Sequence, residues 1–327
     1  MTSRALWLLA YVGLVSAQSW TSQESGTTAD LRGVSAVNGK VVWASGTKGT
    51  FLRSTDSGAT WNFAGLPGAG DLDFRGVQGI DNKTAFLLSS GPGEKSRIYK
   101  TADAGASWRP LQINPDPKGF WDAIAMWDPM HGIVLGDPVN GRFVIYLTSD
   151  GVTWQPQKGP PANSNEGAFA ASNSCLVVRG GHEAWFATGG QGGGRVIHSE
   201  DGGKTWSAAK TPVRHDSESA GIFSLAFSDS LHGIAVGGDY KDTQATRDTS
   251  AVTDDGGKTW RTIPAPFGYR SAAAYIASVR KWVVTGPDGS NWSSDRIAWM
   301  PFSGGYNALS FPWAVGPAGA IGLLDIP

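Results

Sequence analysis

The stretch SEDGGKTW at residues 199–206 decides the fold, because it recurs along the chain. Close copies stand at 54–61 (STDSGATW), 101–108 (TADAGASW), 148–154 (TSDGVTW) and 253–260 (TDDGGKTW), and a degenerate copy stands at 293–299 (SSDRIAW). The tryptophans that end the copies follow one another at intervals of 39 to 54 residues. A repeat of this period in a glycine-rich chain is typical of a β-propeller with one four-stranded blade per repeat.

The spacing inside the motif has a structural explanation. An Asp at the start of a tight turn accepts backbone N–H groups two or three residues on, Gly supplies positive φ, and Trp begins the next strand. Fivefold repetition of the motif favours a structural role over a catalytic one. Each turn offers too few oxygen ligands to coordinate calcium, so we predict no metal site. The structural set comprises Asp56, Asp103, Asp150, Asp201 and Asp255 with Trp61, Trp108, Trp154, Trp206 and Trp260.

The repeat count predicts seven blades. Six repeats end at a tryptophan, and residues 307–326 have room for three more short strands but no fourth. Residues 19–22, near the N-terminus, can supply that fourth strand. The sequence therefore predicts an all-β, seven-bladed propeller of antiparallel blades, a single domain over residues 18–327, closed by the N- and C-terminal strands so that no sheet edge stays exposed.

Composition agrees with this fold and narrows the function. The 45 Gly and 15 Trp, with 17% charged residues, leave little material for long solvated helices. A formal charge of −1 gives no reason to expect a nucleic-acid partner. Cys175 is the only cysteine, so it forms no internal disulfide, and its apolar neighbours predict a buried small side chain.

Residues 1–17 have the pattern of a cleaved signal peptide. A short basic start precedes an apolar run at 5–15, and Ser16 and Ala17 are small residues before a cut at Gln18. We expect a secreted or periplasmic protein with no membrane span after cleavage. The alternative is a retained membrane anchor, although the apolar run is short for a bilayer. The residue directly after the cut is Gln18 and not a cysteine, which argues against a lipoprotein anchor.

The repeats resemble a known family. Asp-box (BNR) motifs are combined with a preceding Gly-x-Ala-Val-Gly strand at 233–237 and, more loosely, at 132–136. This combination resembles the bacterial propellers related to the photosystem II assembly and stability factor, over essentially the whole mature chain. The resemblance implies the propeller fold but little about function, since Asp boxes also occur in sialidases, xyloglucanases and sorting receptors.

Uneven loop lengths point to one face of the ring. Long loops at 113–120, 156–166, 211–220 and 239–248 lie between blades or between second and third strands, opposite the motif turns. Arginines mark the same face and could hold a carboxylate, a phosphate or an acidic protein segment; alternatively, they pair with loop acids or cap strand ends. The predicted binding set comprises Arg32, Arg75 and Arg270 at innermost strands, with Asp122 and Asn307 in matching register, Arg97, Arg142 and Arg195 at third strands, and Trp121.

The alternative function is a glycoside hydrolase, sialidase-like or of another Asp-box type. Such an enzyme needs two opposed carboxylates, and no spacing singles out a pair. The sialidase arginine motif is absent, and His131 and His232 recur beside turns of the motif face, which favours a structural role. The fallback catalytic candidates are Asp122, Asp137, Glu166 and Asp239.

The sequence thus favours a non-enzymatic propeller that binds a partner protein or an anionic or carbohydrate ligand through its long-loop face. No strand-to-helix phosphate loop is present, so no nucleotide cofactor is predicted. We expect a monomer.

Overall fold

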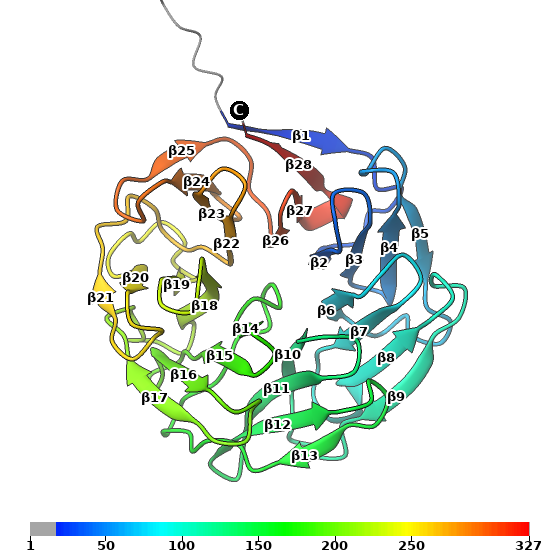
Figure 1. The fold of residues 1–327 in the computed structure, drawn as a ribbon, viewed down its shortest axis with the longest axis horizontal. Helices are drawn as coiled ribbons and strands as arrows, with labels where there is room; N and C mark the ends of the chain where they lie inside the picture. Colours follow the sequence, from blue (N-terminus) through cyan, green and yellow to red (C-terminus); the bar gives the residue numbers. More distant parts are fainter. Residues whose placement is uncertain (1–17, 327) are drawn as a thin grey trace, which may run out of the picture.

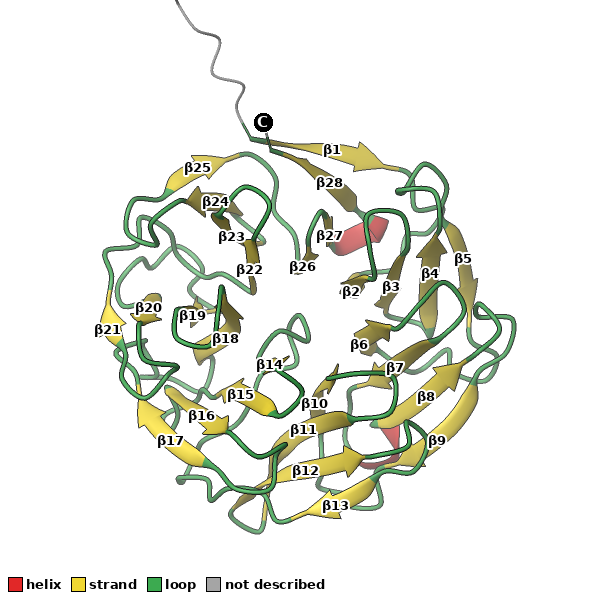
Figure 2. Cartoon of the chain, viewed as in Figure 1, coloured by secondary structure: helices red, strands yellow, loops and turns green. Residues whose placement is uncertain are grey.

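The computed structural model describes residues 18–326 and contains seven four-stranded sheets arranged in a ring (Figure 1). The predicted all-β, seven-bladed propeller is confirmed. Two single turns of 3-10 helix, η1 (Gly93–Lys95) and η2 (Pro317–Gly319), are the only helical elements in the described part of the chain (Figure 2). No helix within it is long and apolar enough to cross a membrane. The predicted signal peptide lies outside the described residues.

Blades 1 to 6 are antiparallel meanders whose strands follow chain order from the channel outward. Blade 1 holds β2 (Leu31–Ala36), β3 (Val42–Gly46), β4 (Thr50–Ser54) and β5 (Asn62–Gly65). Blade 2 holds β6 (Phe74–Gly79), β7 (Ala85–Ser89), β8 (Arg97–Thr101) and β9 (Arg109–Ile113). Blade 3 holds β10 (Trp121–Met126), β11 (Gly132–Val139), β12 (Arg142–Thr148) and β13 (Gln155–Gln157).

The second half of the ring repeats this plan. Blade 4 holds β14 (Leu176–Arg179), β15 (Glu183–Ala187), β16 (Arg195–Ser199) and β17 (Ser207–Lys210). Blade 5 holds β18 (Ala220–Phe227), β19 (Gly233–Asp239), β20 (Ser250–Thr253) and β21 (Arg261–Thr262). Blade 6 holds β22 (Ala272–Ile276), β23 (Lys281–Gly286), β24 (Gly289–Ser293) and β25 (Met300–Phe302).

Blade 7 is built from both ends of the chain. Its three inner strands are β26 (Ala308–Ser310), β27 (Trp313–Val315) and β28 (Ile321–Asp325), and its outermost strand is β1 (Ser19–Gln23). β1 pairs antiparallel with β28 over five residues, from Ser19 opposite Asp325 to Gln23 opposite Ile321. The predicted closure of the ring by the two terminal strands is confirmed.

The apolar core lies between neighbouring blades, where aromatic side chains of one blade meet the next. The ring of Trp108, which ends the motif of blade 2, meets Phe51 of blade 1 edge-on at 5.0 Å. Trp154 of blade 3 meets Phe86 of blade 2 in the same way at 6.4 Å. Such edge-to-face pairs add to the free energy gained by burial. The repeated tryptophans therefore pack the blades against one another.

The four eight-residue motif turns share one hydrogen-bond pattern, whereas in the two shorter copies the Asp accepts N–H groups two and three residues on. In the copy at 54–61, Asp56 accepts the Ser54 hydroxyl at 2.8 Å and both the N–H and the hydroxyl of Thr60 at 2.9 and 2.6 Å. The hydroxyl and N–H of Thr60 lower the pKa of Asp56 to about 2. Ser54 is fully buried, and its oxygen accepts the N–H of Gly58 at 2.9 Å. The first residue of the motif therefore connects the motif Asp to the Gly N–H of the same turn. The sequence alone did not reveal this role.

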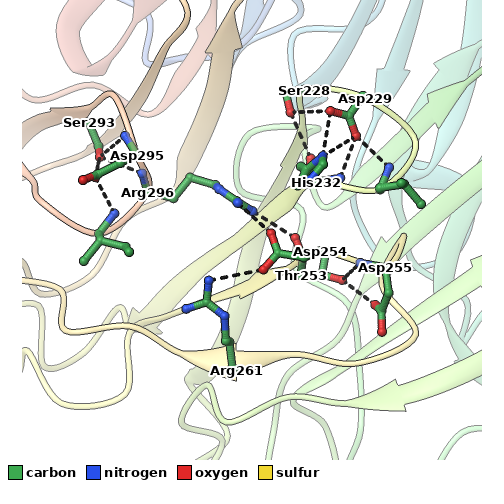
Figure 3. Close-up of polar contacts among 12 residues, drawn as sticks. Ser228, Asp229, His232, Thr253, Asp254, Asp255, Arg261, Ser293, Asp295 and Arg296 are labelled. Carbon is green, nitrogen blue, oxygen red and sulfur yellow. Dashed lines mark hydrogen bonds and ion pairs between the residues drawn. The ribbon is translucent and has the colours of Figure 1, made fainter.

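The motif turns of blades 5 and 6 are joined by charge (Figure 3). In the degenerate sixth copy Arg296 stands beside Asp295, and its guanidinium donates to Asp254 at 2.6 Å and to the Thr253 carbonyl at 2.9 Å. Arg261 also donates to Asp254, at 3.2 Å. The sixth copy therefore ties its blade to the fifth through a side chain that the other copies lack.

His232 and His131 take equivalent places on this face. The Nδ1 atom of His232 lies 2.8 Å from Asp229, and that of His131 lies 2.8 Å from Asp128, each within the turn between the first two strands of its blade. Asp229 also accepts the backbone N–H of His232. Both histidines are therefore tied to local turn carboxylates.

Candidate functional site

The innermost strands of four blades carry a β-bulge near their first residues. A bulge leaves one residue unpaired and re-aims its side chain. The register of pairing shifts between Leu31 and Gly33, Phe74 and Gly76, Trp121 and Ala123, and Ile222 and Ser224. The residues at these shifts are Arg32, Arg75, Asp122 and Phe223, and all four line one cavity of about 600 Å³ at the channel.

Glycine follows the bulged arginine in blades 1 and 2, where neighbouring side chains approach closely. A Cβ atom on Gly33 would lie 2.7 Å from the Ser45 hydroxyl, and one on Gly76 would lie 2.7 Å from the Asn173 side chain. A larger residue at either position would have to displace these side chains, which favours Gly after both arginines. The cavity that they border is called the channel pocket below, and it opens on the long-loop face.

Arg32 and Arg75 form the basic wall of the channel pocket. Arg75 is already engaged, since its Nε donates to Asp73 at 2.7 Å and its Nη1 to the Ala170 carbonyl at 3.1 Å. Arg32 makes no salt bridge to any residue in 18–326, and its Nε has no hydrogen-bond partner there. Burial, and then the charge of Arg75, lower the pKa of Arg32. Arg32 is therefore a partly desolvated cation with donors to spare.

Asp122 and Asp137 form an acidic wall. Asp122 is 1% exposed, and its Oδ2 atom has no hydrogen-bond partner among the described residues. Burial, and then the neighbouring Asp137 carboxyl, raise the pKa of Asp122 well above its usual range. Burial also raises the pKa of Asp137 to about 6, although its Oδ1 accepts the N–H of Ala168 at 2.9 Å. Both carboxyls hold their protons more tightly than exposed ones do, so the pocket is less negative than its residues imply.

A segment at residues 167–174, called the strap below, forms the floor of the pocket, which its residues 168–171 line. It leads into β14 and reaches toward the centre of the ring (Figure 1). Besides the bond from Arg75, the strap makes two hydrogen bonds between Asn173 and the backbone of Ile124, and one from Ser172 to the Ser271 carbonyl at 2.7 Å. These bonds connect blade 4 to blades 2, 3 and 6. The channel pocket is therefore floored, and a ligand enters it from the long-loop face.

Arg270 does not join the other two predicted arginines. It is 6% exposed, donates to the Asn291 side chain at 2.7 Å and to the Tyr269 carbonyl at 2.9 Å, and lies over the Phe267 ring. Arg270 lies two residues before β22, and its N–H donates to the Gly237 carbonyl of the preceding blade, as the N–H of Leu31 does to Gly316. The expectation that three arginines surround the mouth is therefore wrong in placement for Arg270, because Arg270 takes the buried position of Leu31 and not the bulge position of Arg32.

The remaining predicted binding residues are engaged within their own loops. Arg195 forms a buried ion pair with Glu166 at 2.5 Å, and Arg142 donates to the Gly159 carbonyl at 2.7 Å. Arg97 donates to the Glu94 carbonyl. Trp121 is fully buried against Tyr146 at a ring distance of 5.2 Å. These side chains hold strands and loops together, as the alternative interpretation of the arginines expected, and Trp121 presents no surface to a ligand.

Two of the four fallback carboxylates are likewise occupied. Glu166 accepts both Arg195 and the N–H of Asn163, and its side chain is fully buried. Asp239 accepts the Ser217 hydroxyl at 2.8 Å and the Lys241 N–H at 2.9 Å. Asp122 and Asp137 alone line the channel pocket, and they share one wall beside arginines.

An aromatic wall completes the pocket, and sequence reasoning missed it. It consists of Phe169, Phe223, Tyr240 and Tyr269. Phe223 occupies the same bulge position as Arg32, so a register comparison of the innermost strands could have found it. Phe169 lies on the strap, which follows no strand pattern, and no sequence signal marks it.

The fold and the pocket define a class: a seven-bladed β-propeller with a floored, mixed-charge pocket at its channel mouth. No protein-family model matches the chain. Among curated proteins, the chain is 25% identical over 271 residues to the photosystem II assembly protein Ycf48 of Synechococcus sp. (strain JA-2-3B'a(2-13)), an alignment that covers 60% of this chain and 78% of the relative. The resemblance to photosystem II assembly propellers that the repeats indicated is confirmed.

Solved structures show the same fold. The structure described as YCF48 bound to D1 peptide is 16% identical, with a TM-score of 0.68, over 94% of this chain and 97% of that one. The WD40 propeller domain of Doa1 is 13% identical, with a TM-score of 0.64, over 95% and 98%. At these identities the likeness is one of architecture, which many functions share.

Proposed function

We propose that this chain is a non-enzymatic assembly factor that holds an acidic segment of a partner protein in the channel pocket. The observation that carries the proposal is Arg32, a partly buried guanidinium with an unpartnered Nε, facing a floored pocket. A desolvated arginine binds a carboxylate more strongly than an exposed one, because water competes less. Arg75, fixed by Asp73, supports it with a second positive charge.

Two comparisons support the partner class. The curated relative is an assembly protein, and the solved YCF48 is described as bound to a peptide. Neither is described as an enzyme. In this chain two of the long loops contribute to the pocket, 113–120 through Phe120 and 239–248 through Tyr240, and a bound segment could contact them.

We also propose that residues 1–17 direct export and are removed. A basic start, a short apolar run and small residues before Gln18 support this. N-terminal sequencing of the protein purified from the envelope or medium of a producing bacterium should begin at Gln18. An intact Met1 in the exported protein would mean a retained anchor instead.

Replacing Arg32 tests the binding proposal. We expect Arg32→Gln to weaken binding of an acidic partner peptide at least about tenfold, since a charge-assisted hydrogen bond is lost. The loss should be greatest at low ionic strength, where charge attraction reaches furthest. The Tm should change by less than about 2 °C, because a strand-end arginine without an ion pair contributes little to stability. Fluorescence anisotropy against salt concentration measures the first effect, and thermal unfolding the second.

Arg109→Gln is the matched control, since Arg109 is exposed on the outer strand β9, away from the pocket. Equal losses in both variants would contradict a specific role for Arg32. Turnover of a sialoside or plant polysaccharide that disappears in Asp122→Asn would instead favour the hydrolase alternative.

A further inference from the structure

The aromatic wall of the channel pocket is an ordered cluster. The rings of Phe169 and Phe223 stack in parallel, with centroids 4.0 Å apart and planes at 2°. Tyr269 meets Phe223 edge-on at 4.8 Å, and Tyr240 meets both phenylalanines edge-on at 6.1 and 6.4 Å. The four rings come from the strap, β18, the loop after β19 and the connection between blades 5 and 6. Each ring is therefore held by the others before any ligand arrives.

Exposure of these rings changes from the floor to the rim. Phe223 and Tyr269 are 2% and 7% exposed, whereas Tyr240 is 48% exposed. Tyr240 belongs to one of the long loops and leaves a large apolar ring in solvent next to a buried aromatic cluster. Large rings at a pocket rim, fixed at low entropic cost, are typical anchors for a partner's apolar side chain.

The aromatic and basic walls meet at Tyr269. Tyr269 and Arg32 line the same pocket, and the positive charge of Arg32 acts against the rise that burial causes in the pKa of Tyr269. A ligand whose carboxylate is held by Arg32 therefore has its neighbouring atoms beside the rings. A cavity of about 600 Å³ has room for both a carboxylate and one large side chain.

We infer that the channel pocket selects a partner segment in which an aromatic or large aliphatic side chain stands next to a carboxylate. The inference rests on the proposed function and specifies its ligand. Arg32 and Arg75 take the carboxylate. The exposed ring of Tyr240 and the half-buried ring of Phe169 take the apolar side chain, and the buried rings of Phe223 and Tyr269 hold them in place. An inorganic anion can pair with the arginines of the basic wall but leaves the aromatic wall exposed to water. It should therefore bind more weakly than a segment that contacts both walls.

The test uses fluorescein-labelled glycine-flanked peptides containing Phe-Asp, Asp-Phe, Ala-Asp or Phe-Asn, with the full mature chain. The better of the two peptides that carry both Phe and Asp should bind at least about fivefold more tightly than the Ala-Asp peptide, which lacks the ring contacts, and than the Phe-Asn peptide, which lacks the charge. Tyr240→Ala should remove most of the preference for Phe over Ala without altering Ala-Asp binding. Leu231→Ala is the control, because Leu231 is 51% exposed but lies on the motif face.

The variants separate this inference from the proposed function. Arg32→Gln should weaken every Asp-containing peptide, whatever its apolar residue. If it does so while Phe and Ala peptides bind equally and Tyr240→Ala has no effect, the aromatic selection is wrong and the acidic-segment function stands. If no peptide binds, or if inorganic phosphate displaces the Phe-Asp peptide as well as the unlabelled peptide does, the inference is overturned; a failure of Arg32→Gln to weaken any binding overturns the proposed function too.

Discussion

Removal of Ser19–Gln23 should lower the Tm by on the order of 10 °C and promote aggregation. The deletion takes away the whole of β1, and with it the five-residue pairing to β28 and the outer edge of blade 7. An unpaired strand edge is a template for association between chains. The deletion also removes the indole of Trp20, which packs 4.9 Å from Tyr306 and 5.8 Å from Phe302, and this apolar packing contributes on the order of 3 kcal/mol.

The effect is large because β1 joins three blades. Besides its pairing in blade 7, the indole N–H of Trp20 donates to Ser290 of blade 6 at 3.2 Å. Gln23 accepts the indole N–H of Trp61, in the motif of blade 1, at 3.1 Å. Without β1, both neighbours of blade 7 should therefore be destabilised, and each kcal/mol corresponds to roughly 2–4 °C in a domain of this size.

Differential scanning calorimetry of the truncated chain against one that begins at Gln18 measures this effect. Trp20→Ala, which keeps the backbone of β1, should fall between the two. If the truncated chain kept the Tm of the chain that begins at Gln18, β1 would contribute nothing to ring closure.

The architecture was predictable because each blade repeats its own signal. The motif marks the turn before every fourth strand from blade 1 to blade 6, and the absent Trp strand at the C-terminus pointed to β1 as the closing strand. Even the degenerate copy at 293–299 keeps the buried Ser and the Asp. Repetition makes the count of blades robust to the loss of individual residues.

The pocket was only partly predictable because side-chain direction depends on a backbone detail that composition does not encode. Arg32 and Arg270 each stand before a small residue and look alike in the sequence. A bulge at Arg32 turns it into the channel, whereas Arg270 lies before β22, at the position that Leu31 takes in blade 1, and is buried beside Asn291. Nothing in the two tripeptides distinguishes these outcomes.

Blade 4 shows a second limit. Its innermost strand, β14, has four residues, and the strap precedes it without forming a strand. The strap is stabilised by hydrogen bonds to other blades, such as those of Asn173 with Ile124 and of Ser172 with Ser271. Hydrogen bonds between residues 49 and 99 positions apart cannot be read from a local pattern. The aromatic wall and the floor of the pocket both depend on this segment.

Replacing Asp137 by Asn should stabilise the protein at pH 8 and not at pH 4. In the unfolded chain this carboxyl loses its proton near pH 3.8, whereas burial holds the folded pKa at about 6. Between these values the folded state binds more protons, so the free energy of unfolding falls as pH rises, and the penalty persists above pH 6. The pKa difference corresponds to on the order of 3 kcal/mol. An Asn oxygen still accepts the Ala168 N–H, so the strap stays anchored.

Asp122→Asn should act in the same direction, because burial also raises the pKa of Asp122. Asp239→Asn is the control of opposite sign. Burial acts to raise the pKa of Asp239, but hydrogen bonds from Ser219, Lys241 and Ser217 outweigh it and lower the pKa, so losing the charge should destabilise the protein at pH 8. Urea unfolding of all three variants and the wild type at pH 4, 6 and 8 measures these differences.

The two carboxyls should also affect binding in the channel pocket, which they line together with Arg32 and Arg75. Ionised Asp122 and Asp137 would oppose an anion held by Arg32 and Arg75, so both Asn variants should also bind an acidic peptide more tightly than the wild type at pH 8. The advantage should shrink toward pH 5, where the wild-type pair is protonated. Equal stability and equal peptide affinity of the wild type and both Asn variants at every pH would show that the two carboxyls titrate normally, and would remove the electrostatic account of this pocket.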